Sequence, residues 1–272
     1  MDPTIQSILD RAGAQPDDAI DLAEAALALA ALDRPRGVGF DWYRRHLDQL
    51  VGDVAREAGT LPPSESLTAV LARRWGYAGD VDSYDDLQNA NLMRVIDRRK
   101  GLPVTLGILY LHVARAQGWT MVGLNFPSHF LVRLDAGGAR TILDPFHAGM
   151  NRGPGDLRDL LKAVLDAGAE LMPDHYEPVS DRDILLRLQN NLKVRHIRAG
   201  DFGKALSVIE AMRRFAPLHA PLLREAGILY ARLGNMRAAI DALDRYVAAP
   251  GEPEIQRHEA AILLQSFRTS LN

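Results

Sequence analysis

The amino-acid sequence predicts an α+β protein with a helical N-terminal region, a core built around a small antiparallel sheet, and an all-helical C-terminal module. Three observations support this prediction. Apolar residues recur at helical spacing along most of the chain. Three short runs rich in β-branched and aromatic residues lie close together between residues 120 and 146. After residue 190, a pattern of small and aromatic residues repeats at an offset of 34.

The N-terminal region is expected to consist of helices. Pro16, followed by acidic residues, is typical of a helix start, and Pro35 would lie beyond the end of that helix. Apolar residues between 40 and 54 are spaced by threes and fours, which predicts an amphipathic helix. Ser64 is typical of the N-cap of the next helix, which places its apolar residues on one face.

The core is expected to hold one buried helix and an antiparallel meander. The helix follows "KGLP", with Pro103 in its first turn, where the missing N–H costs nothing. Its surface is apolar on most sides, which predicts burial. Strands are predicted at 120–126, 129–135 and 139–146, and Gly137-Gly138 between the last two is typical of a hairpin.

A repeat follows a proline-containing stretch that is typical of a linker. Gly200, Ala205 and His196 align at the offset of 34 with Gly234, Ala239 and Tyr230. A helix–turn–helix unit of this period is the signature of tetratricopeptide repeats, in which small residues let paired helices pack closely. We therefore expect residues 1–175 to form the helical region and core, 176–182 a linker, and 183–272 the repeats with a capping helix.

Composition excludes several classes of function. The 272-residue chain has a net charge of −3 and no cysteine. It therefore has no disulfide, thiolate metal site or thiol nucleophile, and no basic field for nucleic acid. The longest weakly polar stretch, residues 22–33, is too short to span a bilayer. No signal peptide or phosphate-binding glycine loop is evident, so a cytoplasmic protein without a cofactor or membrane partner is expected.

A histidine and an aspartate are the candidate site residues. His129 opens one predicted strand and Asp144 ends the next, so the two side chains can hydrogen-bond across adjacent antiparallel strands. A carboxylate that holds an imidazole in one tautomer is the base half of a catalytic triad. A purely structural role in the sheet is equally open. His147 could complete a metal trio, but "HAGM" is typical of a turn and the spacing is not that of a metal site, so no metal is expected.

The block "RRKGLPVTLGILYL…NFPSHFLVR…LDPF" resembles the transglutaminase-like core. Nearly the whole chain is similar to the bacterial SirB-type proteins, which join a divergent transglutaminase-like domain to tetratricopeptide repeats. The resemblance implies a papain-like core in which a Cys at a helix start acts with a His and an Asp on neighbouring strands. His129 and Asp144 fall on that His and Asp, and Pro103 falls on the Cys. Thiol transglutaminase and cysteine protease activity are therefore excluded.

Two hydroxyl groups are alternatives to the missing thiol. Thr105 lies two residues after Pro103, where a threonine more often hydrogen-bonds the helix start. Ser128 is next to His129, but adjacent residues of a strand point to opposite faces.

The leading prediction is a non-catalytic protein with a binding, scaffold or regulatory role. A cleft walled by Asn125, His129 and Asp144 would hold a small polar ligand or peptide, and the repeats would bind a protein or peptide partner in their groove. The alternative is a hydrolase or acyltransferase in which the His129–Asp144 pair activates water or a relocated nucleophile. In a third interpretation the pair is structural and only the repeats bind partners.

Overall fold

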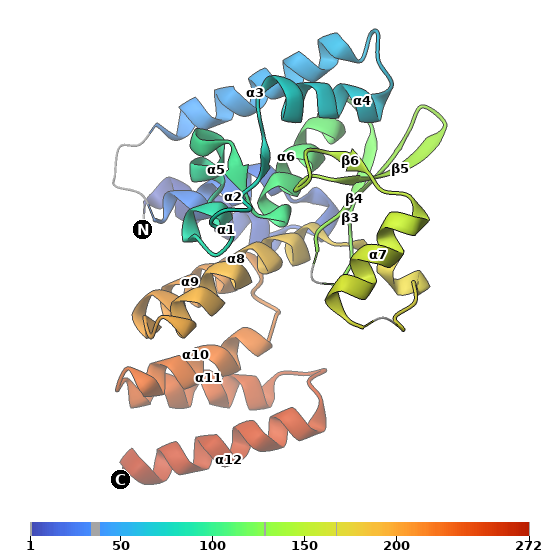
Figure 1. The fold of residues 1–272 in the computed structure, drawn as a ribbon. Helices are drawn as coiled ribbons and strands as arrows, with labels where there is room; N and C mark the ends of the chain where they lie inside the picture. The colour runs from blue at the N-terminus through green and yellow to red at the C-terminus, as the bar shows by residue number, and fades with distance from the viewer. Residues whose placement is uncertain (1, 34–38, 128, 167, 272) are drawn as a thin grey trace. The chain divides into compact units, whose positions relative to one another are not determined.

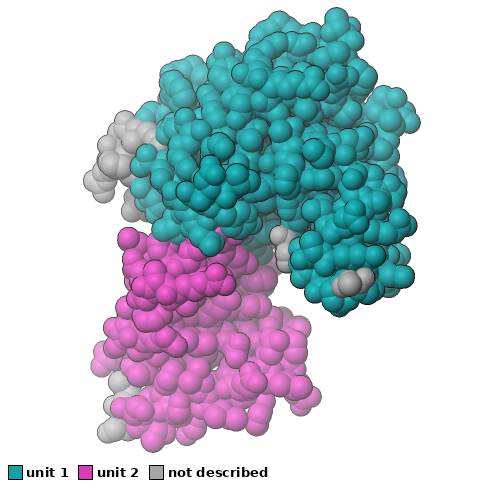
Figure 2. Space-filling view, viewed as in Figure 1, with its two compact units in different colours: residues 1–8, 16–188 teal, residues 9–15, 189–272 magenta. Residues whose placement is uncertain are grey.

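The computed structural model describes residues 2–33, 39–127, 129–166 and 168–271 (Figure 1). The chain forms two compact units, residues 1–8 with 16–188 and residues 9–15 with 189–272 (Figure 2). Unit 1 is the mixed α+β part and unit 2 is helical. The division falls inside α8 (Asp181–Arg198), whereas the sequence suggested a linker at 176–182. Pro35 lies outside the described residues.

The N-terminal helices follow the predicted order, with one difference at the second. α1 (Pro3–Ala14) precedes a 3-10 turn, η1 (Asp17–Ala19), and then α2 (Leu22–Ala31). α2 begins after Asp21 and not at Pro16, because the Asp21 side chain accepts a hydrogen bond from Glu24 N at 3.0 Å and caps the helix. α3 (Phe40–Glu57) buries one apolar face, as its spacing predicts.

The helix predicted after Ser64 starts earlier. Pro62 is the N-cap of α4 (Pro63–Leu67), because a residue before proline is held in an extended conformation. The chain continues as a π-helical segment, η2, and two short parallel strands follow on either side of a helical insertion. Their bounds are η2 Thr68–Arg74, β1 Ala78–Gly79, η3 Leu87–Ala90, α5 Leu92–Arg98 and β2 Lys100–Gly101.

α6 (Pro103–Ala116) is the buried central helix that the sequence predicts. It starts at Pro103, and every residue from there to Leu111 is buried. No helix among the described residues combines the length and the apolar character needed to cross a membrane.

The sheet contains the three predicted strands and two short additional ones. β3 (Thr120–Leu124), β4 (Val132–Ala136) and β5 (Ala139–Asp144) form an antiparallel meander, whose hairpin turns at Gly137 and Gly138, both with positive φ. β6 (Met150–Asn151) pairs with β5, and β7 (Pro178–Val179) pairs with β3, giving the order β6-β5-β4-β3-β7. β7 lies in the stretch that was expected to be a linker.

Helices cover both faces of this sheet (Figure 1). α7 (Pro154–Val164) packs Leu157 and Leu161 against a cluster that includes Val122 and Ile142. Gly123, the neighbour of Val122, faces the opposite side and meets the Phe130 ring, which also contacts α6. A 3-10 turn, η4 (Pro173–Tyr176), leads from α7 to β7.

Unit 2 repeats its local structure at the predicted offset. Gly200 and Gly234 both have positive φ, at 74° and 77°, and each ends a helix. Asp201 and Asn235 then cap the following helices through side-chain oxygens that accept from the backbone N–H three residues on. The helices are α9 Phe202–Phe215, α10 Pro221–Arg232, α11 Met236–Ala248 and α12 Glu254–Leu271. α12 covers the stretch where the sequence predicts a capping helix.

Candidate functional site

The structure brings His129 and Asp144 together. Asp144 is the last residue of β5 and is fully buried, while His129 lies in the segment that leads into β4. The His129 Nε2 atom lies 2.9 Å from Asp144 Oδ1. Because β4 and β5 are paired antiparallel neighbours, the two side chains meet although they are 15 residues apart in sequence.

Asp144 has two further side-chain partners. His147 Nδ1 lies 2.7 Å from Oδ2, and Arg152 donates to the same oxygen from Nε at 3.0 Å and from Nη2 at 2.8 Å. Burial raises the pKa of Asp144, but hydrogen bonds and charge from His129, with hydrogen bonds from Arg152 and His147, outweigh burial and hold that pKa well below its ordinary value. The carboxylate is therefore ionised at neutral pH.

A tight turn carries His147 back onto Asp144. Gly149 N donates to Asp144 O at 2.9 Å, and Met150 N donates to His147 O at 3.1 Å. Ala148 and Gly149 both adopt positive φ, at 55° and 72°. The imidazole rings of His129 and His147 consequently lie 5.8 Å apart. The turn at "HAGM" is confirmed, but the gathering of His147 with the His129–Asp144 pair was not expected from the sequence spacing.

Phe146 forms an aromatic wall beside the two histidines. Its ring makes edge contacts with His129 at 6.2 Å, with His147 at 5.3 Å and with Tyr84 at 5.8 Å. Gly79 lies against it so closely that an added Cβ would stand 2.4 Å from the ring. Sequence reasoning missed this residue, because two of its contacts, Gly79 and Tyr84, lie more than sixty positions away in the sequence.

The start of α6 does not direct a hydroxyl group at the imidazole. Thr105 is fully buried, and its Oγ1 donates to Asn89 O at 2.8 Å. Leu102 N donates to the same carbonyl at 3.0 Å. The Thr105 hydroxyl therefore helps to fix the start of α6 against Asn89. Pro103 is buried at the first position of the helix. Ser128, the other hydroxyl considered, lies outside the described residues.

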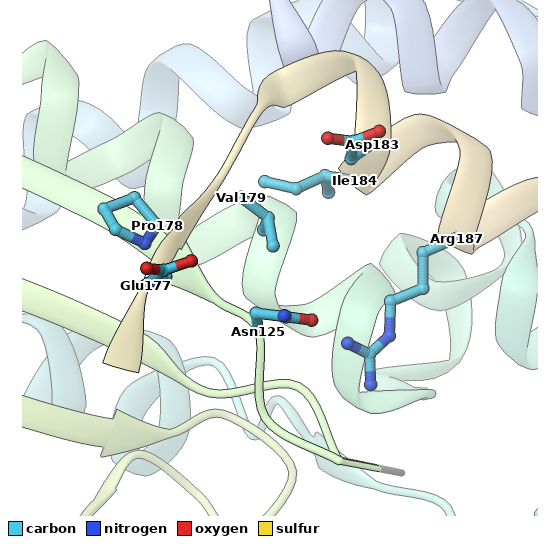
Figure 3. A pocket seen from close by; sticks show the side chains of 7 residues that line it. All are labelled: Asn125, Glu177, Pro178, Val179, Asp183, Ile184 and Arg187. Atoms are coloured by element: carbon cyan, nitrogen blue, oxygen red, sulfur yellow. The ribbon is translucent and has the colours of Figure 1, made fainter. Parts of the chain in front are cut away.

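Asn125 lines a pocket of about 350 Å³ at the end of β3 (Figure 3). The amide of Asn125, which directly follows β3, and the guanidinium of Arg187 in α8 point into the same space (Figure 3). Arg187 Nη2 donates to His129 O at 2.7 Å, so this side chain connects the pocket to the His129–Asp144 pair. Burial lowers the pKa of Arg187. The other lining residues are Glu177, Pro178, Val179, Asp183 and Ile184.

Three groups in this region have the chemistry of metal ligands. His129, Asp144 and His147 each offer one donor atom, and these atoms lie within 4.8 Å of one another. Two nitrogens and one carboxylate oxygen are donors that first-row transition metals accept.

Comparison with known proteins identifies both halves of the chain. A family model described as "Transglutaminase-like superfamily" matches residues 41–190, and a tetratricopeptide-repeat model matches residues 192–265. The UPF0162 protein PA3419 of Pseudomonas aeruginosa is 30% identical over 259 residues, which cover 94% of this chain and 93% of that protein.

Two further relatives show the same kinship. A UPF0162 protein of Xylella fastidiosa is 31% identical over 182 residues, covering 65% of this chain. The aligned part of the chain spans only 64% of that relative's length. Protein SirB1 of Salmonella typhimurium is 24% identical over 230 residues, which cover 84% of this chain and 85% of that protein.

Proposed function

Because the chain belongs to the transglutaminase-like superfamily, we propose that its core is a binding domain and that the protein has a non-catalytic scaffold or regulatory role. The observation that best supports this proposal is that the core keeps the histidine and the aspartate of a catalytic triad but has no thiol beside them. His129 and Asp144 are hydrogen-bonded at 2.9 Å, while Pro103 stands where the resemblance implies a Cys. Thr105, the nearest hydroxyl along α6, is engaged with Asn89. Such a pair can hold a ligand by hydrogen bonds without attacking it.

The pocket beside Asn125 is the proposed ligand site of the core. Arg187 brings a planar guanidinium that can hydrogen-bond a carboxylate through two N–H groups, and Asn125 adds an amide donor and acceptor. Asp183 also lines the pocket, and its Oδ2 accepts the Ser180 hydroxyl at 2.8 Å. We propose that the pocket takes a small polar ligand or a peptide end that carries a carboxylate.

The repeats of unit 2 are the proposed site for a protein or peptide partner. Solenoid repeats present an extended surface to partners. Lys193 of α8 pairs with Glu225 of α10 at 2.5 Å, and Arg224 of α10 pairs with Glu259 of α12 at 3.1 Å. These ion pairs connect the first helices of successive repeats, which supports a preformed docking surface.

An activity screen of the full-length protein tests the non-catalytic role. Amide, ester and isopeptide substrates are offered to the wild type, to His129→Ala and to His219→Ala. His219 is an exposed histidine in unit 2 and controls for the loss of any imidazole. We expect equal background rates for all three proteins. Turnover by the wild type and His219→Ala that disappears in His129→Ala would overturn the proposal.

Titration with short peptides that have a free C-terminal carboxylate tests the pocket. We expect Arg187→Lys to weaken binding, because lysine keeps the charge but lacks the planar guanidinium that donates two parallel hydrogen bonds to a carboxylate. Asn125→Ala should weaken binding without loss of stability, because the Asn125 side chain is exposed. Unchanged affinity in both variants, measured by calorimetry, would show that the peptide does not occupy this pocket.

A hydrolase that activates water is the second candidate. It is favoured by one observation: a buried, ionised carboxylate holds the His129 imidazole, as in a general base. If turnover is found, it should be lost in Asp144→Asn and should depend on pH where an imidazole titrates. Activity that survives Asp144→Asn would exclude this mechanism.

A further inference from the structure

We propose that His129, Asp144 and His147 form a binding site for a divalent transition-metal ion, with Zn²⁺ as the ion of choice. The proposal concerns ion binding alone and does not depend on the proposed scaffold role. It rests on three independent features of the site. These are the geometry of the donor atoms, the support around Asp144, and the backbone that delivers His147.

The donor atoms are already close to the arrangement that a metal needs. His129 Nε2 and His147 Nδ1 lie 2.9 Å and 2.7 Å from different oxygens of Asp144. In a tetrahedral site with bonds of about 2.0–2.2 Å, neighbouring ligand atoms stand about 3.3–3.6 Å apart. An ion can therefore enter between the carboxylate and the two imidazoles if two adjustments occur. Each nitrogen withdraws from its carboxylate oxygen by about 0.4–0.9 Å, and the donor atoms, which lie within 4.8 Å of one another, draw together to this spacing.

Arg152 supplies the outer support that carboxylate ligands generally have. It holds Asp144 Oδ2 through two N–H groups, and His147 N lies 3.3 Å from Oδ1. A carboxylate has about four lone-pair sites. The two imidazole contacts can thus give way to metal bonds while Arg152 stays in place and fixes the orientation of Asp144.

The proton balance of the step is simple. When neutral, each imidazole that donates to Asp144 carries its proton on the nitrogen that faces the carboxylate. Coordination requires a lone pair on that nitrogen, so the proton moves to the other ring nitrogen through solvent. For two neutral imidazoles, no net proton is released and no other reactant is needed.

The backbone around His147 points to a function for this residue. Ala148 occupies the left-handed region at φ 55°, a conformation that costs a non-glycine residue free energy and is concentrated at functional sites. The turn at Ala148 and Gly149 places the His147 imidazole beside the Asp144 carboxylate. Its side chain is 42% exposed, against 14% for His129, which leaves an entry path and a fourth position for water or a ligand oxygen.

The test is a metal titration of the full-length protein, made without a histidine tag and treated with chelator. We expect one Zn²⁺ per chain by calorimetry, and a Co²⁺ derivative with the intense visible absorption of a four-coordinate ion. His147→Gln can keep a hydrogen bond to Asp144 but removes the nitrogen ligand. It should weaken Zn²⁺ binding at least about tenfold, the low end of what even outer-sphere changes cost.

His175→Gln is the matched control, because His175 belongs to the same unit but lies in the 3-10 turn before β7. It should bind Zn²⁺ like the wild type. Circular dichroism of each variant shows whether the fold is kept. The proposal is overturned if the wild type binds no Zn²⁺, or if folded His147→Gln binds as tightly as the wild type.

Discussion

The ring of Phe130 lies against Gly107 so closely that a Cβ atom added to Gly107 would stand 2.4 Å from ring atom Cε1. The same ring meets Gly123 of β3, where an added Cβ would stand 2.7 Å from Cζ. Phe130 is buried and directly follows His129. The two glycines thus allow α6 and β3 to approach the ring, and the position of His129 depends on this packing.

Gly107→Ala is expected to destabilise the protein. The new methyl group meets a buried ring that has little room to move, and overpacking of this kind costs about 1–3 kcal/mol. Alanine would otherwise gain up to about 1 kcal/mol over glycine in a helix. Gly155→Ala in α7 is the matched control, since nothing lies within 4 Å of its added Cβ. Urea unfolding should show a loss for Gly107→Ala and no loss for Gly155→Ala. Equal stability of wild type and Gly107→Ala would mean that the ring moves freely.

Tyr110→Phe and Tyr77→Phe are expected to change stability in opposite directions. Among the described residues, the buried Tyr110 hydroxyl has no hydrogen-bond partner, and burial raises its pKa. Removing an unsatisfied buried group should stabilise the fold by about 1 kcal/mol. The Tyr77 hydroxyl lies 2.7 Å from His46 Nε2 and also accepts from Arg99, so its removal should cost about 1–3 kcal/mol. Chemical denaturation of both variants checks the signs, and a shared sign would contradict the argument.

Most of the fold could be predicted because its signals are local. Helical spacing, the Gly137-Gly138 turn and the 34-residue repeat each depend on residues that are near one another in sequence. The structure differs from the prediction where a particular side chain or a neighbouring strand determines where an element begins or whether it forms. Asp21 starts α2 in place of Pro16 through a side-chain hydrogen bond, and β7 joins the sheet by pairing with β3, which is distant in the sequence.

The site was harder to predict than the fold. The His129–Asp144 pair follows from strand order, and the resemblance to a known core identified Pro103 in place of a thiol. His147 depends on a turn with two left-handed residues, which a spacing argument does not reveal. Arg187 reaches His129 from α8, 58 residues away, so no local pattern connects them. The predicted cleft residues Asn125, His129 and Asp144 remain a proposal for experiment.

Asp144→Asn is expected to destabilise the protein strongly at neutral pH. A neutral amide leaves Arg152 without its buried partner, and breaking a buried ion pair costs about 3–5 kcal/mol. The pKa of Asp144 in the folded protein is lower than in the unfolded chain. The ionised carboxylate therefore contributes its full stabilisation above the ordinary carboxyl pKa of about 4, and this stabilisation is lost as the pH falls below that value. Wild type and variant should therefore converge in stability toward low pH. Asp48→Asn, an exposed carboxylate on α3, should change stability by less than about 0.5 kcal/mol. A gap that persists unchanged in acid would contradict the assignment.

His46 lies in a buried cluster whose charges oppose its protonation. Its Nε2 atom is 3.0 Å from Arg99 Nη1, and the Arg99 guanidinium lies over the rings of Trp75 and Tyr77. Burial, and next the charge of Arg99, lower the pKa of His46 to about 4, although Asp53 and Asp97 act in the opposite direction. Between that value and the ordinary imidazole pKa of about 6.5, the unfolded chain binds a proton that the folded protein does not.

The low pKa of His46 should therefore make the free energy of unfolding depend on pH. That free energy should have its full value above pH of about 6.5 and should decline by up to about 3 kcal/mol as the pH falls to about 4. Urea unfolding at several values in this window measures the decline. His46→Gln removes the titrating group while leaving a polar side chain near Tyr77, so the variant should be less stable at neutral pH but should lose less stability on acidification. His219→Gln, which changes an exposed histidine, should keep the wild-type slope. If His46→Gln also kept it, the decline would belong to other groups and the low pKa of His46 would be wrong.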